Sequence, residues 1–153
     1  MPEAVVDEHV AVLQGLDGRK MSKSYGNTIP LFGTPKQLQK SINKIKTNLL
    51  EPGEPKDPDD STVFQVWCAF ADEAEREQMR QAFAGGIAWG EAKKQLFERV
   101  NDELAPAREI YDRLMANPEE VEAILKQGAE RLRPQSTALL EKVRHAVGLR
   151  AYR

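Results

Sequence analysis

Apolar residues recur at helical spacing through almost all of the chain after Thr34, which predicts a succession of helices. Thr34 is a suitable cap for the first of them, and Pro35 suits its first helical position. An apolar face then follows at intervals of four, three and four residues, formed by Leu38, Ile42, Ile45 and Leu49. We expect this face to be buried and the lysines of the same segment to lie on another side of the helix.

Two shorter helices are predicted after a proline-rich connector. The connector, 51–61, contains three prolines and a glycine, so we expect an acidic loop there. A buried helix should follow through the apolar run at 63–70, capped by either Asp60 or Ser61. A more polar helix should start near Asp72 and end at two consecutive glycines.

A longer helical pattern runs from Trp89 to Leu114 and contains Pro106. Proline lacks a backbone donor and clashes with the preceding turn, so it either divides this segment into two helices or bends one long helix. We favour the bend. One further helix should begin with Asn117 as its cap, because a proline and two glutamates follow it directly.

The helix after Asn117 is expected to end at about Arg133, because a residue that precedes proline disfavours helical geometry. A last helix is predicted over 136–147. Together these patterns predict a mainly α fold, a helical bundle of about six helices.

Only the first 33 residues break the helical pattern. The run HVAVL at 9–13 is consistent with a short strand. The residues after it, QGLDGRKMSKSYGN, include three glycines and two serines and show no apolar periodicity. They therefore predict an exposed, mobile loop.

Composition limits the function classes that the chain can serve. Its 153 residues suffice for one sizeable core, and no apolar run is long enough to cross a bilayer or direct export, so we expect a soluble, cytoplasmic protein. The single cysteine, Cys68, lies in an apolar run and is expected to be buried. His9 and His145 stand far apart in sequence, so no metal centre is predicted.

Charged residues are distributed unevenly along the chain. Residues 51–127 carry 18 acidic and 9 basic residues, whereas 128–153 carry 6 basic and 2 acidic ones. In that last group Arg131 and Arg133 are candidates for phosphate contacts, with an ordinary solvated face as the alternative. The stretch 18–46 has no acidic residue and suggests a polyanionic partner. Its basic residues are Arg19, Lys20, Lys23, Lys36, Lys40, Lys44 and Lys46.

Five consecutive residues in the acid-free stretch suit phosphate binding: Lys20, Met21, Ser22, Lys23 and Ser24. Lysine is a point-charge partner for phosphate oxygens, while serine hydroxyls and backbone N–H groups add neutral donors. Nearby glycines let the backbone approach a ligand closely. Lysines that arrive with loop closure would stabilise a leaving pyrophosphate in the transition state more than in the ground state.

The string KMSKS, placed after a possible strand and before YGNTI, resembles the signature loop of class I aminoacyl-tRNA synthetases. Residues 2–32 resemble the end of the nucleotide-binding domain in the bacterial tryptophanyl-tRNA synthetase family. The later stretches INKIKTN, PGEPKD, GIAWGEAKKQLFERVNDELAPAREIYDRL and ILKQGAERLRP resemble the helical carboxy-terminal domain of that family. The tyrosyl family has a related loop, but its later helices lack the WGEAK segment and the LAPAR bend.

The resemblance implies a fold and a set of partners. Residues 1–33 would form the end of a Rossmann-type catalytic domain, and 34–153 would form a helical bundle of the anticodon-binding type. The implied activity is the ATP-dependent activation of tryptophan and its transfer to tRNA(Trp). Mg²⁺ would accompany the phosphates of ATP, and the intact enzyme would be a homodimer.

The resemblance also assigns roles to individual residues. Lys23 would contact the triphosphate and stabilise the departing pyrophosphate, and Lys20 would assist electrostatically. The other implied contacts are phosphate binding by Ser22 and Ser24, an apolar contact of Met21 that anchors the loop, and adenine binding by the backbone of Ala11 or Val12.

A second signature of class I synthetases, His-x-Gly-His, does not occur in this sequence. We therefore expect the chain to be the carboxy-terminal part of such an enzyme, as a truncated product or a fragment, and to form no aminoacyl-adenylate alone. The main alternative is a free-standing helical RNA-binding module with a relic synthetase loop. A helical bundle that only binds proteins is a further alternative, but it leaves the acid-free stretch unexplained.

Overall fold

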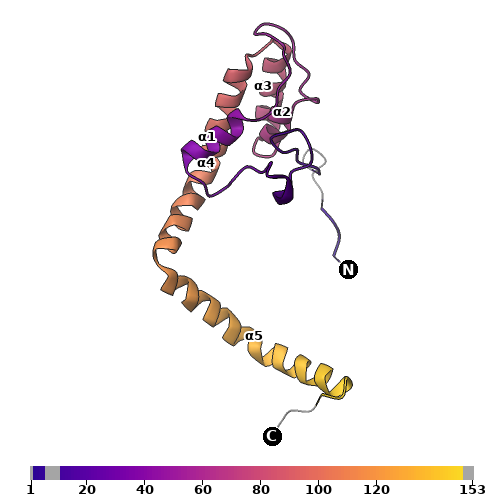
Figure 1. Cartoon of the computed structure of the whole chain (residues 1–153), viewed down its shortest axis with the longest axis vertical. Coiled ribbons are helices and arrows are strands. Elements are labelled where there is room, and N and C mark those ends of the chain that lie inside the picture. Colours follow the sequence, from indigo (N-terminus) through magenta and orange to yellow (C-terminus); the bar gives the residue numbers. More distant parts are fainter. Residues whose placement is uncertain (1, 6–10, 150–153) are drawn as a thin grey trace. The chain divides into compact units, whose positions relative to one another are not determined.

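The computed structural model describes residues 2–5 and 11–149, whose regular structure is helical (Figure 1). Five α-helices follow a short 3-10 helix in this part of the chain, so the mainly α prediction is confirmed, although about six helices were expected. The chain forms two compact units, one up to Glu109 and one from Ile110. The elements are η2 (Lys23–Tyr25), α1 (Pro35–Asn43), α2 (Thr62–Cys68), α3 (Glu73–Ala84), α4 (Trp89–Ala116) and α5 (Pro118–Ala146).

The first three α-helices begin at the caps that the sequence predicts. The Thr34 hydroxyl accepts from the backbone N–H of Gln37 at 3.3 Å, and the Gln37 side chain accepts from the backbone N–H of Thr34 at 2.8 Å. Ser61 is the cap of α2. Asp72 and Glu75 cap α3 by the same reciprocal pair of hydrogen bonds. Local side-chain chemistry therefore fixes where these helices start.

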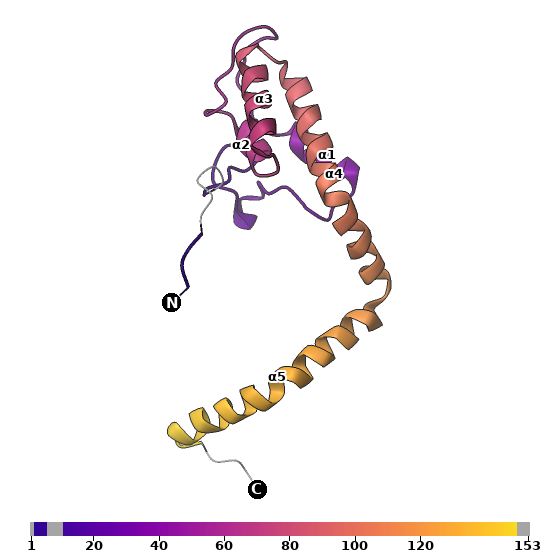
Figure 2. The same ribbon diagram turned by 180° about the vertical axis from the view of Figure 1, so that it is seen from behind.

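The core of the first unit is formed by helices α1 to α4, and the first three gather around the amino-terminal half of α4 (Figures 1 and 2). α2 is buried at most of its positions. Phe83 packs edge-on against Phe64 and Trp89, with ring centroids 5.6 Å apart in both pairs. Cys68 is buried, as predicted. Leu49 is 96% exposed because α1 ends at Asn43, so the predicted apolar face does not extend that far.

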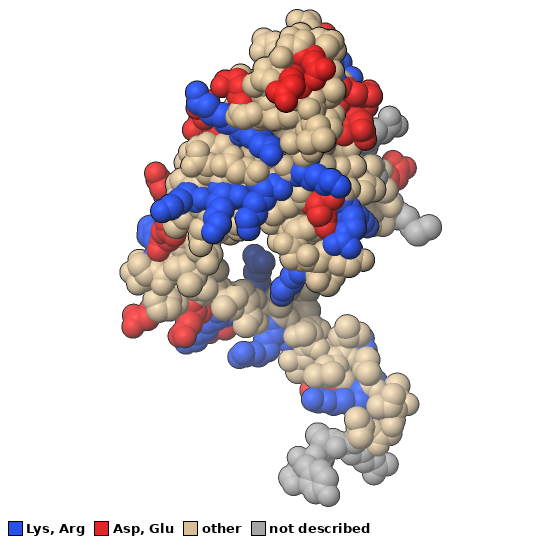
Figure 3. All heavy atoms as spheres, turned by 45° about the horizontal axis from the view of Figure 1, so that its top comes forward, with Lys and Arg blue, Asp and Glu red and all other residues tan. Residues whose placement is uncertain are grey.

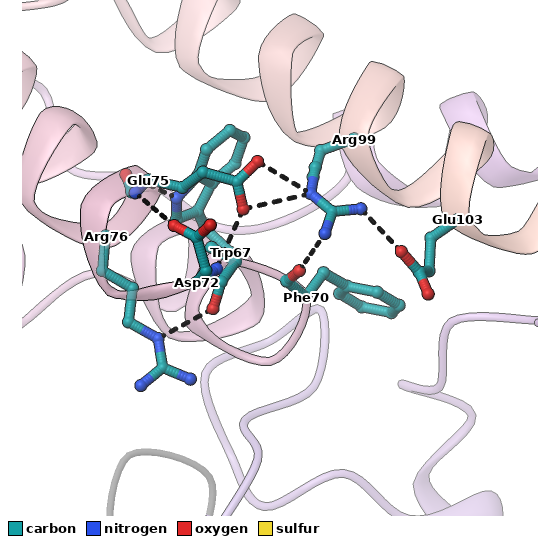
Figure 4. A network of polar contacts seen from close by, with 8 residues as sticks. Trp67, Phe70, Asp72, Glu75, Arg76, Arg99 and Glu103 are labelled. Atoms are coloured by element: carbon teal, nitrogen blue, oxygen red, sulfur yellow. Dashed lines mark hydrogen bonds and ion pairs between the residues drawn. The ribbon is translucent and has the colours of Figure 1, made fainter.

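Arg99 of α4 holds this helix to the turn between α2 and α3 (Figure 4). Its guanidinium donates to the backbone carbonyl of Phe70 and pairs with Glu75, with 3.3 Å between Nε and Oε1. It also donates to Glu103 at 2.9 Å. The Trp67 indole N–H donates to the backbone carbonyl of Glu75 at 3.2 Å, so the turn is held from two sides.

Both long helices continue through an internal proline. α4 is one helix across Pro106, in agreement with the favoured alternative. The predicted break before Pro134 is wrong, because α5 continues through it. A proline removes one backbone hydrogen bond, here the bond to the carbonyl of Glu130, and solvent can satisfy that carbonyl because Glu130 is exposed. Two residues after the proline, the Ser136 hydroxyl donates to the carbonyl of Leu132 at 3.1 Å.

α5 begins after Asn117, as predicted, but the predicted cap is not formed. The Asn117 side chain instead donates to the backbone carbonyl of Arg113 at 2.7 Å. No residue of α5 is buried. Its larger apolar side chains are more than one-third exposed, namely Val121, Ile124, Leu125, Leu132, Leu139, Leu140 and Val143. Among the described helices, none is both long and apolar enough to cross a membrane.

Replacing Arg99 with alanine should lower the free energy of unfolding by about 2 kcal/mol, because the Phe70 carbonyl and the Glu75 carboxylate lose a charged donor. Urea denaturation followed by circular dichroism measures this loss. Lys94→Ala on the same helix is the control, since its ion pair with Glu98 is exposed and 4.0 Å long, and should change the value by less than about 0.5 kcal/mol. Equal effects of the two substitutions would contradict the assigned role of Arg99.

Candidate functional site

The residues that suit phosphate binding belong to the loop 14–27, in which an isolated antiparallel bridge between Gln14 and Lys20 closes the turn before them. Beside the bridge, the backbone N–H of Met21 donates to the carbonyl of Leu13 at 2.8 Å. The strand predicted over 9–13 is not formed where the structure describes it: its first two residues lie outside the described part, and its last three have no strand geometry. The base of the loop is therefore a single bridge, not a hairpin.

Asn27 is the buried centre of this loop, with 2% of its surface exposed. Its Oδ1 accepts from the backbone N–H of Ser22 at 2.8 Å. Its Nδ2 donates to Oδ1 of Asp17 at 2.7 Å and to the backbone carbonyl of Lys20 at 3.3 Å. Its own carbonyl accepts from the backbone N–H of Leu16 at 3.0 Å. One residue thus holds both sides of the loop.

Asp17 connects this centre to the end of the loop. Its Oδ2 accepts from Nε of Arg19 at 2.8 Å, and the Arg19 guanidinium lies 4.4 Å from the centroid of the Tyr25 ring. The hydrogen bond from Asn27, followed by that from Arg19, lowers the pKa of Asp17 from 3.8 to about 2. The carboxylate therefore stays ionised throughout the neutral range.

Lys20 and Lys23 have exposed side chains, and within the described residues neither ammonium group is engaged in a hydrogen bond or an ion pair. Lys23 is the first residue of η2, and Gly26, with a φ of 63°, caps its end. The hydroxyls of Ser22 and Ser24 lie 2.8 Å apart. The loop therefore offers two free cationic groups and two adjacent hydroxyls, a donor set that suits an anionic ligand.

The other predicted site residues lie in two different hollows. Met21 lines a small apolar cavity of about 60 Å³ together with core residues such as Val66 and Val100. Ala11 and Val12 line an open cleft of about 440 Å³. The loop lysines line neither, so the structure does not bring the predicted adenine and phosphate contacts into one cleft. Within the described residues no group of three His, Cys, Asp or Glu side chains could hold a metal ion.

Sequence analysis does not single out Asn27 or Asp17. The available signal is general: the short polar side chains of asparagine and aspartate form hydrogen bonds with nearby backbone groups in turns. Gly15 completes the arrangement, because a Cβ at this position would lie 2.4 Å from Cγ of Asn27. These three residues are the part of the site that the structure adds.

Comparison with known proteins places the loop and helices in one family. The model of the family described as tRNA synthetases class I (W and Y) matches residues 2–105. The chain belongs to this family. The tryptophan–tRNA ligase of Neisseria meningitidis is 53% identical over 150 residues, which make up 98% of this chain and 45% of that relative. The tryptophan–tRNA ligase of Pseudomonas aeruginosa is 50% identical over 153 residues, or 34% of its length.

A solved structure of this synthetase family has the same fold. The tryptophanyl-tRNA synthetase of Campylobacter jejuni, complexed with ADP and tryptophan, matches with a TM-score of 0.83 and 38% identity over 97% of this chain and 47% of that one. These relatives confirm the predicted resemblance to the tryptophanyl branch of the class I synthetases. The chain spans less than half of the length of each of them.

Gly15→Ala should lower the free energy of unfolding by about 1–3 kcal/mol, because the added methyl group would overlap the Asn27 side chain. Gly90→Ala is the matched control: its Cβ would meet nothing within 4 Å, and its helical position favours alanine by up to about 1 kcal/mol. In urea unfolding, the free energy of unfolding should therefore fall in Gly15→Ala and rise or stay the same in Gly90→Ala. A neutral Gly15→Ala would refute the close packing at Asn27.

The pKa of Asp17 predicts an acid-dependent contribution to stability. Because the folded-state pKa of about 2 lies below the ordinary value of 3.8, the ionised group stabilises the fold above about pH 4, and this is lost as the pH falls toward 2. The stability difference between the parent chain and Asp17→Asn, measured by urea unfolding, should be constant from pH 7 to 5 and shrink below 4. A decline that begins near pH 6 would contradict the assigned pKa.

Proposed function

We propose that the chain is the carboxy-terminal portion of a tryptophan–tRNA ligase, in which it supplies the ATP phosphate-binding loop and the helical domain that binds tRNA(Trp). The observation that carries this proposal is the loop in which Lys20 and Lys23 are exposed, with no partner for either ammonium group among the described residues, on a backbone fixed by Asn27. The names of the relatives and the ADP and tryptophan in the Campylobacter jejuni structure support it.

In the proposed reaction the carboxylate of tryptophan attacks the α-phosphorus of ATP, and pyrophosphate leaves with the electron pair of the broken P–O bond. Lys23 stabilises the charge that develops on the pyrophosphate, and Lys20 adds a second cation. Ser22 and Ser24 donate hydroxyl hydrogens to phosphate oxygens. Mg²⁺ accompanies the phosphates as part of the substrate. A ribose hydroxyl of the tRNA then attacks the carbonyl carbon of the adenylate, and the ester bond forms as AMP leaves.

The remaining assignments follow from the same proposal. Residues 1–33 are the end of the Rossmann-type domain and 34–153 are the helical domain. The apolar cavity that Met21 lines supports its role as the contact that anchors the loop. The open cleft beside Ala11 and Val12 has room for an adenine ring near their backbone. We further expect the complete enzyme to be a homodimer and to act in the cytoplasm.

A basic surface supports the binding of tRNA. Figure 3 shows Lys and Arg side chains gathered in a band across one face of the molecule, with acidic side chains clustered at its upper end. Helix α1 carries Lys36 and Lys40, and Lys44 follows at its end; all three are exposed. Such a surface attracts the phosphate backbone of RNA, and its affinity should fall as salt increases.

Arg131 and Arg133 of α5 are exposed, and positions two apart on a helix face different directions. They are therefore expected to contact different phosphates, or only one of them contacts tRNA. The variants Arg131→Gln and Arg133→Gln are each compared with a control, Arg113→Gln, whose guanidinium is already paired with Glu120 at 2.6 Å. At least one of the two should weaken tRNA binding and reduce the slope of log K against log salt by about 1. If both variants bind tRNA as tightly as the control does, these two arginines of α5 do not contact the RNA.

Lys23→Ala tests the role of the loop in a hybrid enzyme, in which residues 1–153 replace the matching segment of the Neisseria meningitidis ligase. The hybrid should catalyse tryptophan-dependent ATP–pyrophosphate exchange, and the 153-residue chain alone should not. Lys23→Ala should lower kcat about 100-fold while the KM for ATP changes by less than about threefold. Lys94→Ala, whose exposed side chain pairs with Glu98 on α4, should leave both unchanged. Equal losses in rate and in ATP affinity would show that Lys23 binds the ground state and the transition state alike.

A further inference from the structure

We propose that Asn27 and Asp17 are positioning residues, whose hydrogen bonds set the direction from which Lys20 and Lys23 approach an anionic ligand. The identity of that ligand, the phosphate chain of ATP, rests on the proposed function. The existence of the clamp does not, because its hydrogen bonds lie within the described chain. We refer to Asn27, Asp17 and their mutual hydrogen bond as the Asn27–Asp17 clamp.

The first step is that only the backbone can direct the two lysines. Neither ammonium group has a hydrogen bond or an ion pair among the described residues, so no side-chain contact fixes its position. The backbone around them is fixed by one amide: Nδ2 of Asn27 holds the carbonyl of Lys20, and its Oδ1 holds the N–H of Ser22, directly before Lys23. A shift of that amide would move both lysines together.

The second step is that the Asn27 amide has one permitted orientation. If its oxygen and nitrogen were exchanged, the oxygen would face the Asp17 carboxylate and the lone pairs of the Lys20 carbonyl, and its N–H would face the N–H of Ser22. All three contacts would then be repulsive. Burial strengthens this preference, because only 2% of Asn27 is exposed and water cannot replace the lost partners.

The third step is that Asp17 carries the constraint to the far side of Lys23. Its carboxylate holds the Arg19 guanidinium, which lies over the ring of Tyr25, the last residue of η2. Lys23 is the first residue of η2. The clamp therefore reaches Lys23 from the residue before it and from the end of its own helical turn, and this double constraint is what a preorganised catalytic loop requires.

Hydrogen exchange on the 153-residue chain tests the clamp directly. In Asn27→Ala the amide of Ser22 loses its acceptor and should exchange at least about tenfold faster. Asn27→Asp keeps an acceptor for the Ser22 N–H, but it sets a second carboxylate against Asp17 and removes the donor to the Lys20 carbonyl. The repelled side chain should turn away, so Ser22 should again exchange faster than in the parent chain, by less than in Asn27→Ala. The double variant Asp17→Asn, Asn27→Asp should recover part of the protection, since the amide at position 17 can then donate to the carboxylate at position 27. Asn43→Ala, at an exposed position, is the control.

Kinetics of the hybrid enzyme distinguish positioning from a structural role. At a temperature where circular dichroism shows each variant folded, Asn27→Ala should lower kcat for pyrophosphate exchange at least about tenfold, with a change below about threefold in the KM for ATP, and the double variant should restore part of kcat. Unchanged protection of Ser22 in Asn27→Ala would overturn the proposal, as would faster exchange with an unchanged kcat. If the unsubstituted hybrid has no activity, the proposed function fails, and hydrogen exchange alone decides whether the clamp orders the loop.

Discussion

The hydrogen bonds of one buried side chain, Asn27, hold the loop that carries Lys20 and Lys23. They connect the residues on both sides of Met21 and hold the Asp17 carboxylate against the loop. Two exposed ammonium groups this close in sequence repel each other and would sample many positions on an unconstrained chain. With the backbone fixed in the folded state, less conformational entropy remains to be lost when an anion binds, and more of the binding energy is available for the transition state.

The helices of the first unit act as the platform for this loop. The backbone N–H of Lys46, after α1, donates to the carbonyl of Leu16 at 2.9 Å. The Thr62 hydroxyl, at the start of α2, donates to the Gln14 side chain at 2.6 Å. Leu13, Leu16 and Ile29, in and beside the loop, pack against the core, so the loop has both polar and apolar contacts with the helices. The packing of the helices and the position of the loop are therefore parts of one structure.

The helices of the first unit could be predicted because their determinants are local. Caps such as Thr34 and Asp72 lie within one turn of the groups that they satisfy, and apolar spacing marks the buried faces. The wrong predictions came from rules that consider only neighbouring residues and leave out solvent exposure and the point where a helix ends. Pro134 was expected to end a helix, but an exposed helix loses only one hydrogen bond to it, and Leu49 continued an apolar spacing beyond the end of α1.

The residues that we propose for phosphate binding are named from the sequence, whereas the side chain that holds their backbone is not. KMSKS is a contiguous string with a recognisable donor set. The partners of Asn27 lie between five and ten residues before it, and only the folded loop brings them to a single amide. Neither apolar periodicity nor residue type distinguishes this asparagine from the others in the chain.

A crystal structure of the hybrid enzyme with a nonhydrolysable ATP analogue and tryptophan would test the central claim most directly. We expect the Lys23 ammonium within about 2.7–3.2 Å of a phosphate oxygen, while Asn27 keeps its hydrogen bonds to Ser22 and Asp17. Phosphates bound elsewhere, with both lysines still facing solvent, would contradict the role assigned to this loop.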